Sequence, residues 1–290
     1  MTFIQLVLSG LALGAAYALV ALGFVFIVNA TGAVNFAQGD FVMAGGYTAI
    51  FLTSTFSIPM VLLLPLVAVI TFVMGVFLAL IAYFPLMRRP PATVFISTLL
   101  CGMILQNLFL IGFGPQAKSG PALLGTGMLR FEGLEISRQS LATIVVAAAL
   151  IGLQYLIFAR TQIGRRLRAT AEDRDMAEAV GIPAKKLIAV TFGIGASLAG
   201  IAGALLANQY FVSPTGGIPL SVFAYIAVVI GGWGSLAGAV LGSMLISIFQ
   251  VIVSAYVSYA VATGALYAAV LLIFLVRPQG IFSERVQRRA

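Results

Sequence analysis

Residues 1–28 read MTFIQLVLSGLALGAAYALVALGFVFIV, a run without a single charged side chain. A helix that crosses a bilayer needs about 20 mostly apolar residues. The run has no basic segment at its start and stays apolar for longer than the core of a signal peptide, so we interpret it as a retained first span. The chain continues in this way, with 61% hydrophobic residues, 8% charged residues and a mean hydropathy of +1.12. Soluble domains carry about 25% charged residues, so the composition predicts an all-α polytopic membrane protein.

The apolar signal is interrupted by polar residues, Pro and Gly, which divide it into nine predicted spans. These lie near residues 3–28, 36–54, 58–86, 92–113, 140–159, 187–207, 219–232, 235–256 and 261–276. The second and the seventh are short and rich in glycine, so either can be a broken or re-entrant helix. We therefore expect eight to ten transmembrane or partly re-entrant helices in one domain over residues 1–290, with no separate soluble domain.

Several kinds of function are disfavoured by the residue types present. The chain has no His, which is the commonest metal ligand and the usual proton shuttle, and it has one Cys, Cys101, in an apolar segment. Neither a metal-ligand cluster nor a catalytic pair of carboxylates is apparent in the spans, so we predict no enzyme activity and no metal. The net charge of +8 comes from short basic clusters between apolar runs. Such clusters do not form the basic face that nucleic-acid binding requires.

The basic residues predict the orientation in the membrane. Thirteen of the sixteen fall in three segments, 88–89, 160–186 and 277–289. Lys and Arg are enriched in short cytoplasmic loops, and alternating spans put these three segments on one side. We therefore predict that they, and the C-terminus, are cytoplasmic. The long connection 114–139, which includes Lys118, Glu132 and Glu135, then faces outward.

The segment 160–186 is the only sizeable charged part of the predicted cytoplasmic side. From Gly164 to Val180 it is rich in helix-forming residues, and Gly181 and Pro183 are placed to end a helix. Arg174 and Glu178 are spaced for an i,i+4 ion pair. The segment therefore predicts one short, stiff helix.

Two interpretations of this helix remain open. It can be an ordinary connection, solvated on one side and lying on the membrane on the other. It also carries a small apolar patch of Met176, Ala179 and Val180, and an apolar patch on a helix outside the membrane suits docking into a groove of a cytosolic partner. Small residues at Ala177, Ala179 and Gly181 would permit close approach.

Four strings carry a resemblance to a known family. AEAVGIPAKKLIAVTF (177–192) resembles the "EAA" coupling loop of ABC importer permeases, with Val180 where the general pattern has Ala. GAVNFAQGDFVMAGGY (32–47), FGIGASLAGIAGAL (192–205) and AVVIGGWGSLAGAVLG (227–242) resemble motifs of the branched-chain (hydrophobic) amino-acid permease family. The similarity extends over essentially the whole chain, with the motifs in the family's order.

The resemblance implies the permease subunit of an ABC importer in a bacterial cytoplasmic (inner) membrane. Its partners would be a second, homologous permease subunit, two cytosolic ATPase subunits, an extracytoplasmic solute-binding protein and membrane lipid. The chain has no GxxxxGK[ST] loop, so ATP and Mg would bind the ATPase subunits, and we expect no cofactor on this chain. The cargo would be branched-chain or other hydrophobic amino acids, or related amides or urea. The predicted ATPase-coupling residues are Arg165, Arg166, Arg168, Glu172, Asp173, Glu178, Ala179 and Gly181.

Two glycine-rich stretches point to close packing or to the border of a passage. Within FGIGASLAGIAGALLAN (192–208), small residues recur every four positions, which lets helix backbones approach in lipid. The only Trp, Trp233, stands between Gly232 and Gly234. This stretch is either a re-entrant turn beside the passage or a plain interfacial loop.

Asp40 is the only acidic residue before Glu132. Ionisable residues in membrane spans suggest function by default, but no second acid accompanies it in the spans. It can be the N-cap of a broken helix, a contact of the substrate or gate, or part of an ion-coupling site, and Asn35 can cap the preceding piece. The predicted residues of the passage or broken helix are Asn35, Gln38, Gly39, Asp40, Gln106, Asn107, Gly232, Trp233 and Gly234.

The alternative function is a self-contained secondary transporter or channel driven by an ion gradient. Such a protein needs charged groups within the membrane. The spans offer almost none besides Asp40, so the permease interpretation is favoured.

Overall fold

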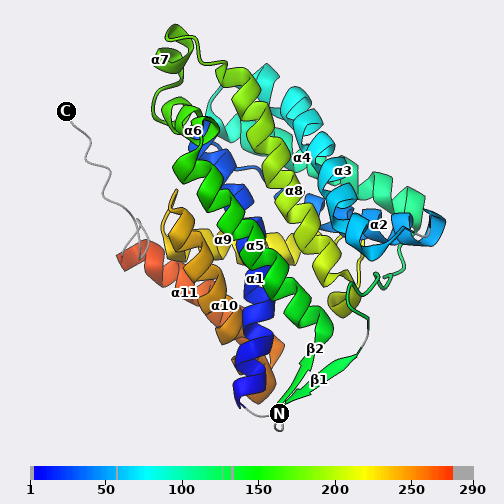
Figure 1. The fold of residues 1–290 in the computed structure, drawn as a ribbon. Helices are drawn as coiled ribbons and strands as arrows, with labels where there is room; N and C mark the ends of the chain where they lie inside the picture. The colour runs from blue at the N-terminus through cyan, green and yellow to red at the C-terminus, as the bar shows by residue number, and fades with distance from the viewer. Residues whose placement is uncertain (1–2, 57, 126, 132–133, 277–290) are drawn as a thin grey trace.

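The computed structural model describes residues 3–56, 58–125, 127–131 and 134–276 (Figure 1). Glu132 and the basic residues of the predicted cytoplasmic tail, Arg277, Arg285, Arg288 and Arg289, lie outside the described residues. In chain order the elements are α1 (Phe3–Thr31), α2 (Gln38–Phe56), α3 (Met60–Leu78), a π turn (Ala79–Tyr83), a 3-10 turn (Phe84–Leu86), α4 (Pro91–Phe113), β1 (Met128–Phe131), β2 (Leu134–Ser137), α5 (Arg138–Arg160), α6 (Gln162–Glu172), α7 (Arg174–Ala179), α8 (Ala184–Tyr210), α9 (Gly217–Gly231), α10 (Leu236–Tyr256) and α11 (Tyr259–Val276).

The predicted all-α polytopic architecture is confirmed. Each of the nine predicted spans corresponds to a helix, with ends that differ by a few residues. Among the described residues, seven helices are long and apolar enough to cross a membrane, and α2 and α9 are not among them. With 15 residues, α9 is about 22 Å long, shorter than the hydrocarbon core of about 30 Å. The second and the seventh predicted spans, α2 and α9, are thus the two helices that do not qualify as full membrane spans.

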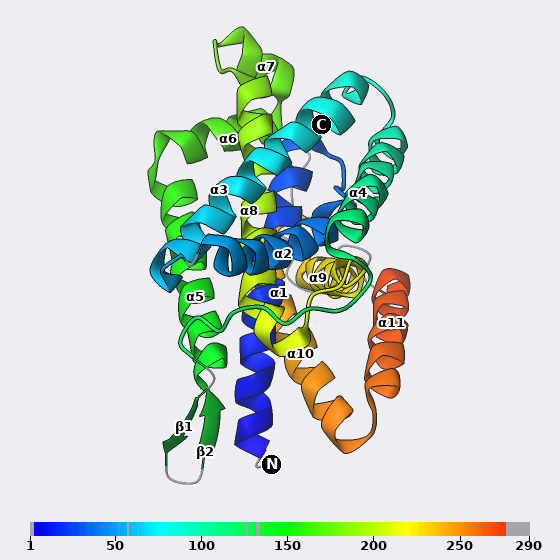
Figure 2. The same ribbon diagram turned by 90° about the vertical axis from the view of Figure 1, so that its right-hand side faces the viewer.

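The core forms around α1 and α8. Nearly all side chains of α1 between Leu6 and Val28 are buried, because α10, α8, α5 and α9 surround it. In turn, α8 packs against α2 and α3 as well as α1. Figure 2 shows α2 crossing in front of the long helices α1 and α8, with α9 seen nearly end-on beside it. The two short helices therefore lie across the direction of the long ones.

The connection 114–139 runs from the end of α4 to the end of the molecule opposite α6 and α7 (Figures 1 and 2). It contains the β1–β2 hairpin and is tied to the end of α8, since Gly120 N donates to Ala207 O at 2.9 Å and Gln139 Nε2 donates to Leu205 O at 2.7 Å. The two loops predicted to face opposite sides of the membrane therefore lie at opposite ends of the fold.

The segment 160–186 differs from the single helix predicted for it. The helix breaks at Asp173, whose extended backbone lets its side chain cap α7 by accepting a hydrogen bond from Met176 N at 2.9 Å. The local capping geometry therefore outweighs the helix propensity of the flanking residues. The predicted ending is confirmed, because Gly181 adopts a positive φ of +82°.

The apolar patch on α7 is confirmed in part. Met176 and Val180 are exposed, as a docking patch requires, and Arg174 pairs with Glu178 at 3.3 Å. The prediction that Ala177 permits a partner's close approach is wrong, because this residue is buried within the chain.

The small residues of α8 pack against backbone from other helices. A Cβ on Gly203 would clash with the carbonyl of Val42 on α2, and a Cβ on Gly45 would clash with the backbone of Gly200. Ala196 and Ala204 are fully buried beside them. The interpretation of these rows as tight intramembrane packing is confirmed.

We predict that Gly203→Val destabilises the fold by about 1–3 kcal/mol or more, because the added methyl groups force α2 away from α8. Thermal unfolding of the detergent-purified chain measures the effect. Gly264→Val on α11 is the matched control, since a Cβ there meets nothing within 4 Å. Equal stability of the two variants would contradict the packing argument.

Candidate functional site

The turn between α1 and α2 is organised by Asn35. Its Oδ1 accepts a hydrogen bond from Ala37 N at 3.1 Å, and its Nδ2 donates to Gln38 Oε1 at 3.4 Å. Gln38 Nε2 in turn donates to Gly195 O on α8 at 2.9 Å. Both amide side chains are almost fully buried. Asn35, two residues before the N-cap position Ala37, therefore satisfies a free N–H at the start of α2 and, through Gln38, fixes the turn to the core.

The prediction that Asp40 is an N-cap is wrong, because α2 already begins at Gln38 and Asp40 lies in its first turn. The proposed capping role belongs to Asn35, which acts on α2 rather than on the preceding piece. A carboxylate in the first turn is still favoured by the helix dipole. The break between α1 and α2 was predicted correctly. The residue whose side chain stabilises the turn is Asn35, and not Asp40 as predicted.

The Asp40 carboxylate reaches across to α4. Its Oδ1 accepts a hydrogen bond from Gln106 Nε2 at 2.7 Å, and the residue is only 5% exposed. Gly102 makes room for it, since a Cβ there would clash with Oδ2. Within the described part of the chain, Asp40 forms no ion pair with a Lys or Arg. It is a buried carboxylate balanced by one amide and a helix N-terminus.

Asp40 and Gln106 line a cavity of about 360 Å³. This volume lies within the range of about 300–1,000 Å³ that is typical of ligand sites. Its walls come from α1, the α1–α2 turn, α2, α4 and α9, and apart from Asp40, Gln106 and Ser221 they are mostly apolar. The lining residues are Phe24, Phe36, Gly39, Asp40, Leu99, Met103, Gln106, Ile218, Ser221, Val222 and Tyr225.

The first turns of the two short helices meet at this cavity. Gly39 of α2 and Gly217 of α9 approach so closely that a Cβ on either would clash with the other's backbone carbonyl. The N-cap of α9, Gly216, provides no side-chain hydrogen bond. Because the positive ends of helix dipoles lie at N-termini, the region favours negatively charged groups.

The predicted turn around Trp233 lies beside the cavity. Gly232 and Gly234 both have positive φ, at +110° and +83°, and connect α9 to α10. The Trp233 ring packs edge-on against Tyr225, a cavity residue, with centroids 5.9 Å apart. Asn29 Nδ2 of α1 donates to Gly234 O at 3.0 Å. The turn thus supports one wall of the cavity without lining it.

Asn107, in contrast, is not brought to the cavity. Its side chain is exposed and donates to Met103 O within its own helix at 2.8 Å. Sequence reasoning also missed Ser221 and Tyr225 on α9 and Phe36 in the turn. The i,i+4 spacing of Ser221 and Tyr225 places them on one helix face, but nothing in the sequence indicates that this face meets Asp40.

The predicted coupling residues lie on α6, α7 and the turns that flank α7. Arg168 Nη1 donates to the carbonyl of Phe158 in the last turn of α5, which ties α6 to that helix. Arg174 Nη2 lies 3.8 Å from Met87 Sδ, at the end of the turns that follow α3. Two contacts thus connect α6 and α7 to long helices.

Known proteins are similar to this chain along nearly its whole length. The family model described as "Branched-chain amino acid transport system / permease component" matches residues 6–276. The high-affinity branched-chain amino acid transport system permease protein BraD of Pseudomonas aeruginosa is 32% identical over 97% of this chain and 96% of its own length. LivH of Escherichia coli (strain K12), with the same description, is 31% identical over 97% and 96%.

A third relative is more distant. The permease protein LivM of the same high-affinity branched-chain system in Escherichia coli (strain K12) is 26% identical over 91% of this chain and 67% of its own length. No solved structure matches the chain.

We predict that Asn35→Ala lowers the stability of the chain by about 1 kcal/mol or more, because it removes the cap of α2 and leaves buried partners unpaired. Asn107→Ala, whose side chain bonds only within α4, is the control and should change stability by less than about 0.5 kcal/mol. Thermal unfolding in detergent compares them. A stable Asn35→Ala variant would exclude the capping role.

Proposed function

The chain belongs to the family of branched-chain amino acid transport system permease components, and from this premise we propose that it moves branched-chain or other hydrophobic amino acids, or related amides or urea, into the cytoplasm. It would work by alternating access as one membrane subunit of an ABC importer. The names of the relatives support the cargo, and the apolar helices and composition support a multi-pass membrane protein.

The observation that carries the proposal is the cavity between α2, α4 and α9. Its apolar walls suit an aliphatic side chain, whereas the backbone of an amino acid carries one positive and one negative charge. Asp40 Oδ2 has no hydrogen bond within the described part of the chain and is available for an ammonium group. The positive end of the α9 dipole, at Gly217, favours a carboxylate nearby. We assign Asp40 to substrate contact on this chemistry.

We propose four kinds of partner for this chain: a second permease, ATPase subunits, a binding protein and membrane lipid. LivH and LivM of one organism are named as permeases of the same system and both resemble this chain, which supports pairing with a second, homologous permease. ATP and Mg would act on two separate ATPase subunits at the cytoplasmic side, and an extracytoplasmic binding protein would deliver the cargo at the 114–139 side. In this orientation the C-terminus is cytoplasmic and the membrane is the bacterial inner membrane.

The α6–α7 segment has the properties that ATPase coupling needs. Met176 of α7 and Val180, the C-cap of α7, are exposed beside the Arg174–Glu178 ion pair. Together they form an apolar patch with a charged flank. Such a face suits a groove on a cytosolic partner. Movement of α7 would reach the turns after α3 through Met87, and α8 through the direct packing of α7 on α8.

An ion-coupled secondary transporter is the less favoured alternative. Asp40 is the only acidic residue in the described helices α1 to α4 and α8 to α11. A single carboxylate held by one amide does not form the group of ligands that a cation site usually gathers.

We predict that uptake into vesicles requires ATP and co-expressed ATPase subunits, and that Glu178→Lys lowers uptake at least tenfold while ATP hydrolysis continues. The charge reversal breaks the pair with Arg174 on the docking face. Glu178→Gln, which removes the charge without reversing it, should lower uptake less. Uptake by the chain alone, driven by a proton or sodium gradient, would overturn the proposal.

We predict that Asp40→Asn lowers uptake of a hydrophobic amino acid by about 10- to 150-fold. The amide keeps the size of the carboxyl group but loses a charged hydrogen bond worth about 1.5–3 kcal/mol. Uptake at saturating and limiting cargo, together with thermal unfolding of the same variant, provides the measurement. Wild-type uptake by a stably folded variant would show that Asp40 has only a structural role.

A further inference from the structure

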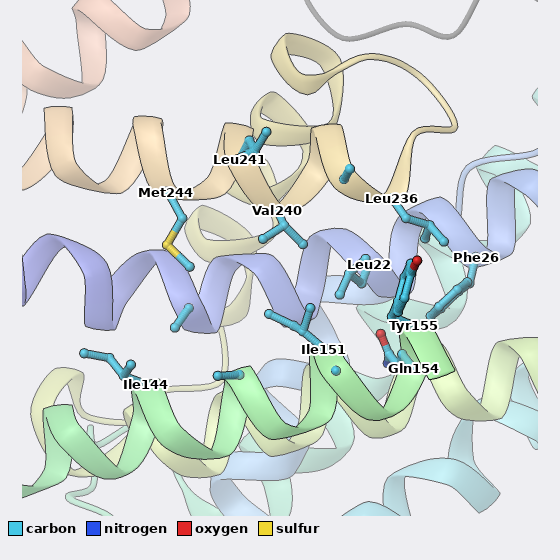
Figure 3. A pocket seen from close by; sticks show the side chains of 14 residues that line it. Leu22, Phe26, Ile144, Ile151, Gln154, Tyr155, Leu236, Val240, Leu241 and Met244 are labelled. Carbon is cyan, nitrogen blue, oxygen red and sulfur yellow. The ribbon is translucent and has the colours of Figure 1, made fainter. Parts of the chain in front are cut away.

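An apolar groove lies between α5 and α10, with α1 as its floor (Figure 3). Its volume is about 690 Å³. Leu22 and Phe26 of α1 line it, together with Ile144 and Ile151 of α5 and Val240 of α10. It lies apart from the Asp40 cavity, and the proposed transport cycle does not use it.

The groove has the length of one membrane leaflet. It runs along α5 from Ile144 to Tyr155, which corresponds to about 16 Å at 1.5 Å per residue. Half of a hydrocarbon core of about 30 Å is about 15 Å. Ala148 of α5 and Leu241 of α10, which both line the groove, are exposed, as expected of a lipid-facing surface.

The end of the groove nearest α6 is polar. Gln154 is 9% exposed, and neither its Oε1 nor its Nε2 has a hydrogen-bond partner within the described residues. An unpaired amide is costly within a membrane. Figure 3 shows Gln154 and Tyr155 beside Phe26 at this end. An acyl-ester oxygen at the boundary of the hydrocarbon region would give the Gln154 N–H an acceptor.

Positive charge lies just beyond the same end. The Phe26 ring stacks on Phe158 with centroids 4.4 Å apart, and the carbonyl of Phe158 accepts a hydrogen bond from Arg168 of α6. Arg165 is exposed and lies one helical turn before Arg168, so the two side chains share one flank of α6. This flank therefore adjoins the polar end of the groove. Basic sites beside membrane helices bind anionic headgroups.

We propose that the groove binds one phospholipid with an anionic headgroup, with an acyl chain between α5 and α10. The net negative charge of the headgroup, which a zwitterionic lipid lacks, lies at Arg165 and Arg168. Length, apolar walls, an unpaired amide and adjacent positive charge all match this ligand. The site is independent of the cargo and lies next to the segment assigned to ATPase coupling, so a bound lipid would stabilise the α5–α6 junction. Arg165 and Arg168 then hold the lipid, and ATPase contact remains with α7.

The test is native mass spectrometry of the full-length chain in mild detergent, with phosphatidylglycerol or phosphatidylcholine of identical acyl chains added. The wild type should retain at least fivefold more phosphatidylglycerol than phosphatidylcholine. Arg165→Gln should remove most of this preference, and Arg166→Gln, on the other flank of α6, should keep it. Equal retention of the two lipids by the wild type, or an unchanged preference in Arg165→Gln, would overturn the proposal.

The acyl-chain site is tested by filling the groove. A Cβ on Gly152 of α5, which lines the groove, meets nothing within 4 Å, so Gly152→Leu adds bulk in open space. It should lower retention of both lipids at least fivefold, while Gly264→Leu on α11 retains them as the wild type does. Unchanged retention in Gly152→Leu would place the lipid elsewhere.

A second readout works in the native membrane with the complete importer. A photo-crosslinking amino acid at the exposed Ala148 in the groove should yield an adduct with a phospholipid. An adduct with another polypeptide would instead show that the groove is a subunit interface and would overturn the proposal.

Discussion

The close backbone packing between the short helices and their neighbours is the constraint on which the rest of the structure depends. Gly203 of α8 meets the Val42 carbonyl, Gly45 meets Gly200, and Gly39 meets Gly217 without room for a Cβ. In lipid, apolar surfaces gain little by associating, so van der Waals contact between backbones must hold helices together. These contacts hold α2 and α9 across the long helices. Neither of the two helices is among those long and apolar enough to cross a membrane.

The cavity follows from that arrangement. Because the first turns of α2 and α9 meet at Gly39 and Gly217, the side chains of those turns face α4 across a small space. Asp40 is then held by Gln106 and by the dipole of its own helix rather than by a basic residue. A carboxylate held this way retains an oxygen for a ligand, which is the property that distinguishes a binding group from a structural ion pair.

Hydropathy and breaker residues predicted all nine apolar helices and singled out the two short ones, because burial in lipid imposes the same simple pattern on every span. Local capping was harder: the sequence placed Asp40 at the cap, whereas Asn35 provides it, and the break at Asp173 was missed because propensity favoured one helix. The hydrogen-bond partner of Asp40 could not be predicted from the sequence at all. Gln106 and Asn107 are neighbours on α4, but about 100° of helix rotation separates them, and nothing local says which one faces α2.

If cargo passes through the cavity between α2, α4 and α9, the accessibility of a thiol placed in that cavity should depend on cargo. Ser221 lines the cavity, and with Cys101 replaced by Ala, Ser221→Cys provides a single thiol. In the assembled importer, a small water-soluble thiol reagent should label this position, and a transported amino acid should slow the labelling severalfold. Labelling at the same rate with and without cargo, or no labelling at any stage of the cycle, would contradict the account.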